Sequence, residues 1–350
     1  MAERKVALLV LGAGAWGTAL GSRLASSGAN VRLWSRSEKL AKRINELRVN
    51  QEYLPEIKLS ENLTASSNLA ELVNWLKNEP NDEIKCLFLA IPSKGFDQIC
   101  SRLQQFNLQN LIFVSLCKGV VFFEGKNYFP SEIIKRYFPE NDVCILSGPS
   151  FANEVARGLP FAISCSSDDL NLARKLSIVL NSEGMRVYAI SDNIGVEVSG
   201  AMKNVLAIAS GVCDGLSLGL NARASLITRG MAETVRLGVA LGAEKDTFLG
   251  LAGAGDLFLT TTGELSRNRK VGKEIAAGGR LEEVLSNLGQ VAEGVSNAPK
   301  LLSLGRALKV SLPITREVCL LLEKKKDGKI TVLEFSSNSF VSITSGTRVA

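Results

Sequence analysis

The first half of the chain alternates short, continuous apolar runs with stretches in which apolar residues recur at helical spacing. A continuous apolar run is typical of a strand that is buried on both faces of a parallel sheet. The strands predicted in this way are Val6–Leu11, Val31–Trp34, Cys86–Ile91, Leu111–Leu116, Val143–Leu146, Ala162–Cys165 and Val187–Ile190. Helices are predicted between several of them, at Ala15–Ser26, Ser37–Leu47, Asn68–Lys77 and Phe96–Phe106. The alternation predicts a parallel, doubly wound α/β sheet.

After Ser191 the strand signals nearly vanish and amphipathic helical patterns take over. A chain of 350 residues is too long for one typical core, so two domains are expected. We predict an α/β domain over residues 1–192, followed by an all-helical domain over residues 193–350. The helices predicted in the second domain include Gly195–Val212, Asn221–Leu241, Leu281–Leu288 and Ser296–Leu308.

The composition restricts the classes of function. The net charge of +6 suits a small anionic ligand such as a phosphate or a nucleotide, and without a dense basic stripe no nucleic-acid binding is predicted. Because the chain has no histidine, proton transfer has to use Lys, Asp, Glu, Tyr or Cys side chains. The seven cysteines are scattered and odd in number, without a C-x-x-C pair. They predict a reducing, cytoplasmic location, with neither a disulfide framework nor a metal site.

The N-terminus imitates a secretion signal. Arg4 and Lys5 precede the apolar run Val6–Leu11, as the charged and apolar regions of a signal peptide do. The glycine-rich turn that follows favours a buried strand, because a cleaved leader has no use for such a turn. No run of about 18 apolar residues occurs in the chain, so no membrane span is predicted.

The turn Gly12-Ala13-Gly14-Ala15-Trp16-Gly17 follows the first predicted strand and opens the first predicted helix. Gly12 permits the tight turn, Gly14 lets the backbone approach a pyrophosphate, and Gly17 lets the helix pack closely on the strand. The helix N-terminus offers N–H groups and a positive dipole end to the phosphates. The pattern predicts a dinucleotide-binding unit of the Rossmann type, with Gly12, Gly14, Ala15, Trp16 and Gly17 at the cofactor.

The second predicted strand ends in Trp34-Ser35-Arg36-Ser37, where an NAD-specific unit usually carries Asp or Glu for the ribose hydroxyls. Arg36 can pair with a 2′-phosphate, and Ser35 and Ser37 can add hydrogen bonds. This favours NADP(H) as the cofactor, with NAD(H) tolerated. The alternative is an ordinary solvent-exposed arginine.

Two residues of the second half are candidates for proton chemistry. Lys203 lies among small residues on one face of the predicted helix Gly195–Val212, which leaves space beside its amine. The alternative is a solvated lysine on a helix surface. Asp256 lies in what the glycines predict to be a turn. That turn lacks a preceding strand, so it is not predicted to be a second nucleotide site.

The segment Ser266-Arg267-Asn268 is a candidate phosphate site. Its hydroxyl, guanidinium and amide groups can donate hydrogen bonds to one phosphate. The alternative is a helix N-terminus with a serine cap and a basic face.

Taken in order along the chain, these motifs resemble those of the bacterial type of NAD(P)-dependent glycerol-3-phosphate dehydrogenase. The resemblance implies reversible reduction of dihydroxyacetone phosphate to sn-glycerol 3-phosphate, the backbone of phospholipids. The segments that carry it are Gly12–Leu20, Ala90–Ser93, Lys118–Gly119, Leu146–Ala152, Gly200–Val205, Asn221–Ala224, Ile227–Gly230, Ala252–Leu257, Leu265–Arg269 and Gln290–Gly294.

The resemblance also implies a role for each matching residue. Lys203 would be the general acid/base, with Asp256 beside it, and Lys118 would lie near both the substrate and the nicotinamide. Arg267 and Asn268 would bind the substrate phosphate. Further substrate contacts would come from Gly148, Ser150 and Ser266, and further cofactor contacts from Lys118, Ala152, Arg267, Val291 and Glu293.

Three positions depart from the family's pattern. Cys117 stands where threonine is common, Leu220 stands where aspartate is usual, and the tail beyond Lys326 differs from the usual ending. Two other functions stay open at this point: a related hydroxyacid or sugar-acid dehydrogenase, and a regulator that senses a dinucleotide without turnover. We expect the active site in the cleft between the domains, and a homodimer is a possible assembly.

Overall fold

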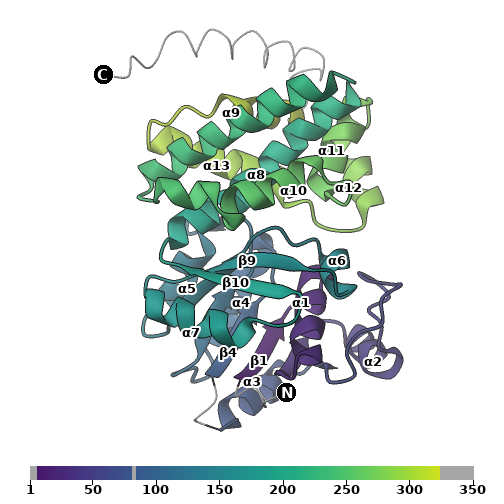
Figure 1. Ribbon diagram of the computed structural model, residues 1–350, viewed down its shortest axis with the longest axis vertical. Coiled ribbons are helices and arrows are strands. Elements are labelled where there is room, and N and C mark those ends of the chain that lie inside the picture. Colours follow the sequence, from purple (N-terminus) through teal and green to yellow (C-terminus); the bar gives the residue numbers. More distant parts are fainter. Residues whose placement is uncertain (1–5, 81–83, 324–350) are drawn as a thin grey trace. The chain divides into compact units, whose positions relative to one another are not determined.

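The computed structural model describes residues 6–80 and 84–323. The chain divides into two compact units, and the division falls between Glu197 and Val198. It lies inside a continuous helix, somewhat later than the boundary near residue 192 that the change of sequence pattern predicts. The colours of Figure 1 follow the chain from the sheet of the first unit to the helices of the second.

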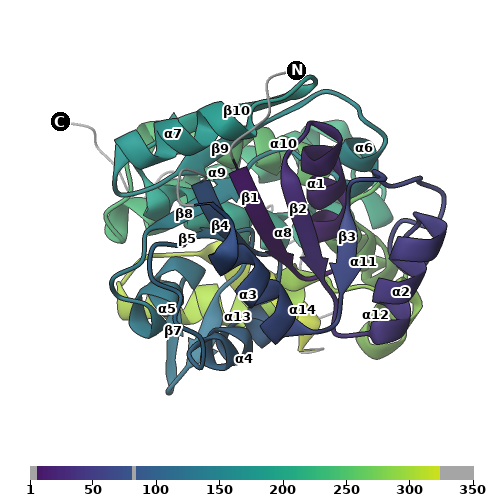
Figure 2. The ribbon, with the colours of Figure 1, turned by 90° about the horizontal axis from the view of Figure 1, so that it is seen from below.

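The first unit is built on an eight-stranded sheet with the order β10-β9-β8-β5-β4-β1-β2-β3. Figure 2 shows several of these strands side by side. Each predicted strand is present, and β3 is an addition that its short polar sequence did not signal. The strands are β1 (Val6–Leu11), β2 (Asn30–Trp34), β3 (Thr64–Ser66), β4 (Ile84–Leu89), β5 (Ile112–Ser115), β8 (Val143–Ser147), β9 (Phe161–Ser166) and β10 (Met185–Ile190).

The expectation of a wholly parallel sheet is wrong at one pair of strands. β8 and β9 are antiparallel, with Leu146 opposite Cys165, while the other neighbouring strands of this sheet are parallel. The connection between them holds only the five-residue helix α6 (Ala152–Ala156). The chain therefore re-enters the sheet at the end where β8 finishes, which reverses its direction.

β1 explains why its sequence is a continuous apolar run. All six of its residues are fully buried. Val6, Leu8 and Val10 belong to the hydrophobic cluster on one face of the sheet, and Ala7, Leu9 and Leu11 belong to the cluster on the other. The structure thus confirms the prediction of a buried strand at the position that imitates a signal peptide.

Three helices of the first unit begin at a capping side chain. Side chains of Ser37, Asn68 and Asp169 accept backbone N–H groups at the starts of α2, α3 and α7. The helices α5, α6 and α7 and the hairpin β6–β7 were not predicted. The remaining elements are α1 (Ala15–Ser26), α2 (Glu38–Leu47), α3 (Leu69–Asn78), α4 (Ser93–Leu103), β6 (Val121–Phe123), β7 (Lys126–Tyr128), α5 (Pro130–Tyr137) and α7 (Leu170–Leu180).

The second unit is helical throughout its described part, as predicted. Asp256 does not lie in a turn, because the glycines before it form a π-helical segment, η2, that runs directly into α10. The elements are α8 (Asn193–Gly215), whose first residues belong to the first unit, α9 (Gly219–Ala240), η1 (Lys245–Leu249), η2 (Leu251–Gly255), α10 (Asp256–Thr262), α11 (Arg267–Ala276), α12 (Leu281–Leu288), α13 (Glu293–Ala307) and α14 (Pro313–Leu322).

Helix α8 is long and apolar enough to span a membrane, and among the described residues it is the one helix that is. Its most apolar window is completely buried inside the protein. Burial of this kind is typical of a core helix, which explains why polar residues on it, such as Lys203, are buried as well.

Candidate functional site

The glycine-rich turn is tightly packed at Gly12 and Gly17 and open at Gly14. Gly12 has a φ of +118°, and a Cβ atom there would lie 2.4 Å from the carbonyl oxygen of Ala90. A Cβ atom on Gly17 would lie 2.1 Å from the carbonyl oxygen of Gly12. Gly14 differs, because a Cβ atom there would meet nothing within 4 Å. Gly12 and Gly17 are thus needed by the fold, whereas Gly14 faces open space at the N-terminus of α1.

The end of β2 presents Arg36 to solvent, and the serines beside it have local partners. Ser37 caps α2 by accepting the N–H of Leu40, and the hydroxyl of Ser35 accepts the N–H of Ser37. These contacts hold the backbone on both sides of Arg36, and its guanidinium remains exposed.

Three predicted substrate residues of the first unit lie together. The amine of Lys118 and the hydroxyl of Ser150 both donate to the carbonyl oxygen of Gly148, at 3.0 and 2.9 Å. Gly148 has a φ of +150°, and a Cβ atom there would lie 2.9 Å from the Cα atom of Ile163. Only glycine therefore fits beside β9 at this position. Ala152 follows as the first residue of α6.

The centre of the second unit's site is a buried lysine. Lys203 is 8% exposed and Asp256 is 1% exposed, and the lysine Nζ lies 2.5 Å from Asp256 Oδ1. The Nζ atom also donates to the hydroxyl of Thr260 at 2.9 Å, and that hydroxyl lies 3.3 Å from the same carboxylate oxygen. The solvated alternative for Lys203 is therefore wrong. A charged amine is held by a carboxylate and a hydroxyl at a fixed position.

A narrow pocket, too small to hold a water molecule, adjoins this lysine. The hydroxyl of Ser199, one turn before Lys203 on α8, is buried and has no hydrogen-bond partner among the described residues. The pocket is lined by Ser199, Lys203, Met231, Thr234, Gly253 and Leu257.

The segment Ser266-Arg267-Asn268 forms the start of α11. Ser266 caps this helix, because its hydroxyl accepts the N–H of Arg269 at 3.3 Å. Arg267 is exposed and donates to the Oε1 atom of Gln290 at 3.3 Å. The structure thus shows the helix N-terminus that the sequence offered as the alternative, with a basic side chain on its first residue. Such a terminus remains compatible with anion binding.

Asn268 is buried and connects three segments. Its Nδ2 atom donates to Asn204 Oδ1 at 2.9 Å, and its Oδ1 atom accepts the N–H of Gly294 at 2.9 Å. A Cβ atom on Gly294 would lie 2.4 Å from the carbonyl oxygen of Asn204, so glycine is required where α13 meets α8. Asn268 still has a second N–H hydrogen, beyond these two bonds, for a ligand.

The predicted cofactor residues Val291 and Glu293 lie at the start of α13, beside this contact. Val291 is half exposed, and Glu293 is in the first turn of the helix. Sequence reasoning missed Thr260 and the contacts made by Asn204 and Gly294. Thr260 is spaced one turn from Asp256 on α10, which is the signal that could have found it.

Two buried carboxylates lie outside this set. Burial raises the pKa of Glu197 to about 8, although the hydrogen bonds from Ser131 oppose the shift. Burial also raises the pKa of Glu233 to about 7, against hydrogen bonds from Ile314 and Thr315 at the start of α14. Both carboxylates therefore cap helices, and neither contacts the Lys203 cluster through the hydrogen bonds just described.

Comparison with known proteins gives two matches to family models. One, described as the N-terminus of NAD-dependent glycerol-3-phosphate dehydrogenase, covers residues 5–173, and the other, described as its C-terminus, covers residues 192–332. The chain belongs to the glycerol-3-phosphate dehydrogenase family. This confirms the resemblance found in the sequence.

Individual members of the glycerol-3-phosphate dehydrogenase family are similar along almost the whole chain. The glycerol-3-phosphate dehydrogenase (NAD(P)+) of Cupriavidus necator is 44% identical over 324 residues, which cover 90% of this chain and 93% of that protein. The enzyme of the same name from Nitrosomonas eutropha is 44% identical over 312 residues, covering 89% and 91%. The crystal structure of glycerol-3-phosphate dehydrogenase from Coxiella burnetii is 34% identical, with a TM-score of 0.88, and the match covers 94% and 98% of the two chains.

Proposed function

We propose that this chain catalyses the reversible reduction of dihydroxyacetone phosphate to sn-glycerol 3-phosphate with NAD(P)H. The observation that carries the proposal is the buried Lys203 amine, held by Asp256 and Thr260 in a chain without histidine. The glycerol-3-phosphate dehydrogenases to which the chain is similar act with NAD(P)+ according to their names.

The residues of the first unit fit a dinucleotide. The open space beside Gly14 and the N–H groups at the start of α1 suit a pyrophosphate, and Gly12 and Gly17 keep the turn compact. The exposed Arg36 supports a preference for NADP(H), with NAD(H) tolerated, because its guanidinium can pair with a 2′-phosphate. The bound nicotinamide supplies the hydride.

Lys203 has the proton role. Reduction of the ketone leaves a negative charge on its oxygen, and a positively charged amine stabilises that charge and donates the proton. Asp256 orients the amine through a buried, charge-assisted contact. Thr260 accepts a second hydrogen of the amine, which fixes the direction of the amine further.

The N-terminus of α11 has the phosphate role. Arg267 stands on its first residue, and Asn268 retains an N–H hydrogen, so a dianion would meet two donors and the positive end of a helix. Binding the phosphate there would hold the ketone in position for reaction.

The other assignments remain predictions. They include the division into a cofactor domain of residues 1–192 and a catalytic domain of residues 193–350, a cytoplasmic location and a homodimer. All seven cysteines are buried and none forms a disulfide among the described residues, which agrees with a reducing compartment. The residues concerned are Lys118, Gly148, Ser150 and Ser266 for the substrate, and Ala15, Trp16, Lys118, Ala152, Arg267, Val291 and Glu293 for the cofactor.

The test is an absorbance assay of NADPH and NADH oxidation with dihydroxyacetone phosphate. We expect turnover with dihydroxyacetone phosphate and none with a three-carbon 2-oxo acid, which lacks the phosphate. Preference for the 2-oxo acid would favour a hydroxyacid dehydrogenase. Tight NADPH binding without turnover of either compound would favour a dinucleotide-sensing regulator.

A further inference from the structure

Helix α8 carries more than the catalytic lysine on one face. Lys203, Ser210 and Asp214 are spaced so that they lie in one row along the helix. Lys203 contacts Asp256 and Thr260 on α10, and Ser210 donates to the carbonyl oxygen of Thr261 at 2.7 Å. The row continues to Asp214, whose ion pairs are made with other helices than α10.

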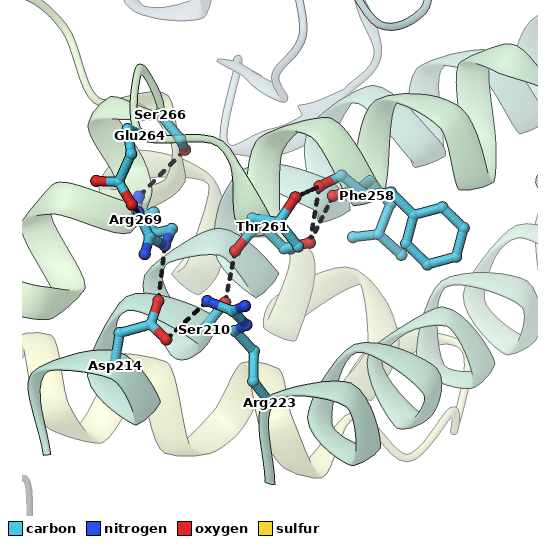
Figure 3. A network of polar contacts seen from close by, with 10 residues as sticks. Ser210, Asp214, Arg223, Phe258, Thr261, Glu264, Ser266 and Arg269 are labelled. Atoms are coloured by element: carbon cyan, nitrogen blue, oxygen red, sulfur yellow. Dashed lines mark hydrogen bonds and ion pairs between the residues drawn. The ribbon is translucent and has the colours of Figure 1, made fainter. Parts of the chain in front are cut away.

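Asp214 binds two arginines from different helices. Figure 3 shows its carboxylate between Arg269 and Arg223. The Nε atom of Arg269 on α11 lies 2.7 Å from Asp214 Oδ2, and the Nη1 atom of Arg223 on α9 lies 3.0 Å from Asp214 Oδ1. Arg269 also reaches Glu264 at 2.8 Å, but the Glu264 side chain is 81% exposed. Solvent screens that exposed pair, so the contact with Asp214 is the stronger tie of Arg269.

Glycines let α8 and α11 approach so closely that these side chains meet. A Cβ atom on Gly211 would lie 1.9 Å from the carbonyl oxygen of Arg269, and one on Gly272 would lie 1.9 Å from the carbonyl oxygen of Ile208. Gly215 likewise faces the backbone of Lys273. With no side chain between them, the two backbones are in contact, and a shift of α11 along α8 would cause a backbone clash.

Arg269 belongs to the first turn of α11, the turn that contains Arg267 and Asn268. Its N–H closes the Ser266 cap while its side chain is fixed to Asp214. The proposed phosphate donors are therefore tied to the helix that carries Lys203.

We infer that the Asp214–Arg269 ion pair positions the phosphate-binding turn of α11 relative to the Lys203 amine. Arg269 and Asp214 are positioning residues: they set the distance between the phosphate-binding turn and the Lys203 amine, which has to match the separation of phosphate and ketone oxygen in the substrate. They thereby contribute to selecting a three-carbon phosphate. This inference rests on the proposed function.

The test compares two neighbours of the same carboxylate. Arg269→Gln removes the tie to α11 and leaves Asp214 paired with Arg223. Arg223→Gln is the matched control, because it removes an ion pair of Asp214 on α9 and leaves the tie to α11. We expect Arg269→Gln to raise the KM for dihydroxyacetone phosphate about tenfold, the effect of one charge-assisted hydrogen bond, with a much smaller change in kcat. Arg223→Gln should leave that KM close to the wild-type value.

Dihydroxyacetone, which lacks the phosphate, separates positioning from general damage. Arg269→Gln should lower kcat/KM for dihydroxyacetone phosphate and leave kcat/KM for dihydroxyacetone unchanged. Arg269→Lys keeps the charge, so its KM for dihydroxyacetone phosphate should lie between those of the wild type and Arg269→Gln. It replaces Arg269→Gln in the comparison if a thermal melt shows that the Gln variant is not folded. Equal KM values for the Arg269→Gln and Arg223→Gln variants, or equal losses on both substrates, would overturn the inference while wild-type turnover still supported the function. Absence of wild-type turnover would instead overturn the function.

Discussion

The glycine turn at the start of α1 and the lysine cluster on α8 are both candidate binding sites, but they are built in different ways. The turn uses residues that are adjacent in sequence, and what matters in it is the absence of side chains at Gly12, Gly14 and Gly17. The cluster joins residues from helices far apart in the chain, and what matters is the charge and direction of side chains such as Lys203 and Asp256. Backbone recognition is therefore local in sequence, and side-chain chemistry is not.

The free-energy cost of forming the glycine turn also differs from the cost of forming the lysine cluster. The turn costs little beyond glycine's conformational entropy. The cluster places two charges where they are almost inaccessible to water, which is tolerable because each neutralises the other. Substitutions in the turn should therefore affect the cofactor first, and substitutions in the cluster should affect turnover first.

Removal of the lysine amine should have the largest effect. Lys203→Ala should lower kcat by about a thousandfold or more, because general acid catalysis and stabilisation of the oxyanion are lost together. NADPH binding, measured by fluorescence titration, should stay within a few-fold of wild type. Lys270→Ala is the control, since Lys270 is an exposed lysine paired with Glu274 on α11. Near-normal turnover of Lys203→Ala would remove Lys203 from its proposed role.

The glycines of the turn provide a matched pair of variants. Gly14→Ala should keep the thermal stability and weaken NADPH binding by about tenfold or more, because its Cβ would occupy the space that we assign to the pyrophosphate. Gly17→Ala should lose stability as well, because its Cβ would lie 2.1 Å from a backbone oxygen. Calorimetry and cofactor titration check both. Unchanged cofactor affinity in Gly14→Ala would argue against a dinucleotide at this turn.

Arg36 is a residue of the predicted cofactor site that is proposed to act through its side chain. Arg36→Ala should weaken NADPH binding by about 10- to 100-fold, the value of a charge-assisted contact, and change NADH binding little. Titration with both cofactors measures the ratio. Equal losses for the two would show that Arg36 does not bind the 2′-phosphate.

The smallest expected effect is on the pH dependence of stability, and it comes from Glu197. This carboxylate is buried like Asp256 but is hydrogen-bonded to Ser131 instead of to a lysine. The pKa of Glu197 rises from its ordinary 4.5 to about 8, because it is buried and because Glu132 and Asp168 are near. The folded state then keeps a proton that the unfolded state loses, so stability falls as the pH rises from about 4.5 to about 8. Glu197→Gln should remove this contribution and reduce the fall in Tm by several degrees.

Glu140→Gln is the control for that experiment. Glu140 is an exposed carboxylate that follows α5 and is not among the groups that raise the pKa of Glu197. Melting curves of all three proteins across this pH range should show the flattened profile only for Glu197→Gln. The same profile in wild type and Glu197→Gln would mean that Glu197 is ionised in the folded state.

The sequence predictions were accurate where the signal is local in sequence and incomplete where the structure depends on distant segments. β1, α1 and α12 have the predicted bounds, because a continuous apolar run, a glycine turn and an amphipathic repeat are local signals. β3 was missed since it has three residues and follows no apolar pattern. The strand β9 was predicted, but its antiparallel direction was not, because an apolar run gives no strand direction.

Site residues divide in the same way. Lys203 was found as a candidate from the small residues around it, yet whether it was buried depended on α10, which lies far along the chain. Thr260 had only its one-turn spacing from Asp256 as a local signal. Its contact with Lys203, and the contact of Asn204 with Asn268, each join two helices that are far apart in the chain. The family resemblance supplied the roles that periodicity could not.

Product analysis tests the central claim most directly. Wild-type protein would be incubated with dihydroxyacetone phosphate and NADPH, and cofactor consumption would be compared with the amounts of sn-glycerol 3-phosphate and its enantiomer. The account predicts one sn-glycerol 3-phosphate for each NADPH oxidised, because the phosphate-binding turn and Lys203 hold the ketone in one orientation. Oxidation of NADPH without this product, or an equal mixture of the two enantiomers, would contradict it.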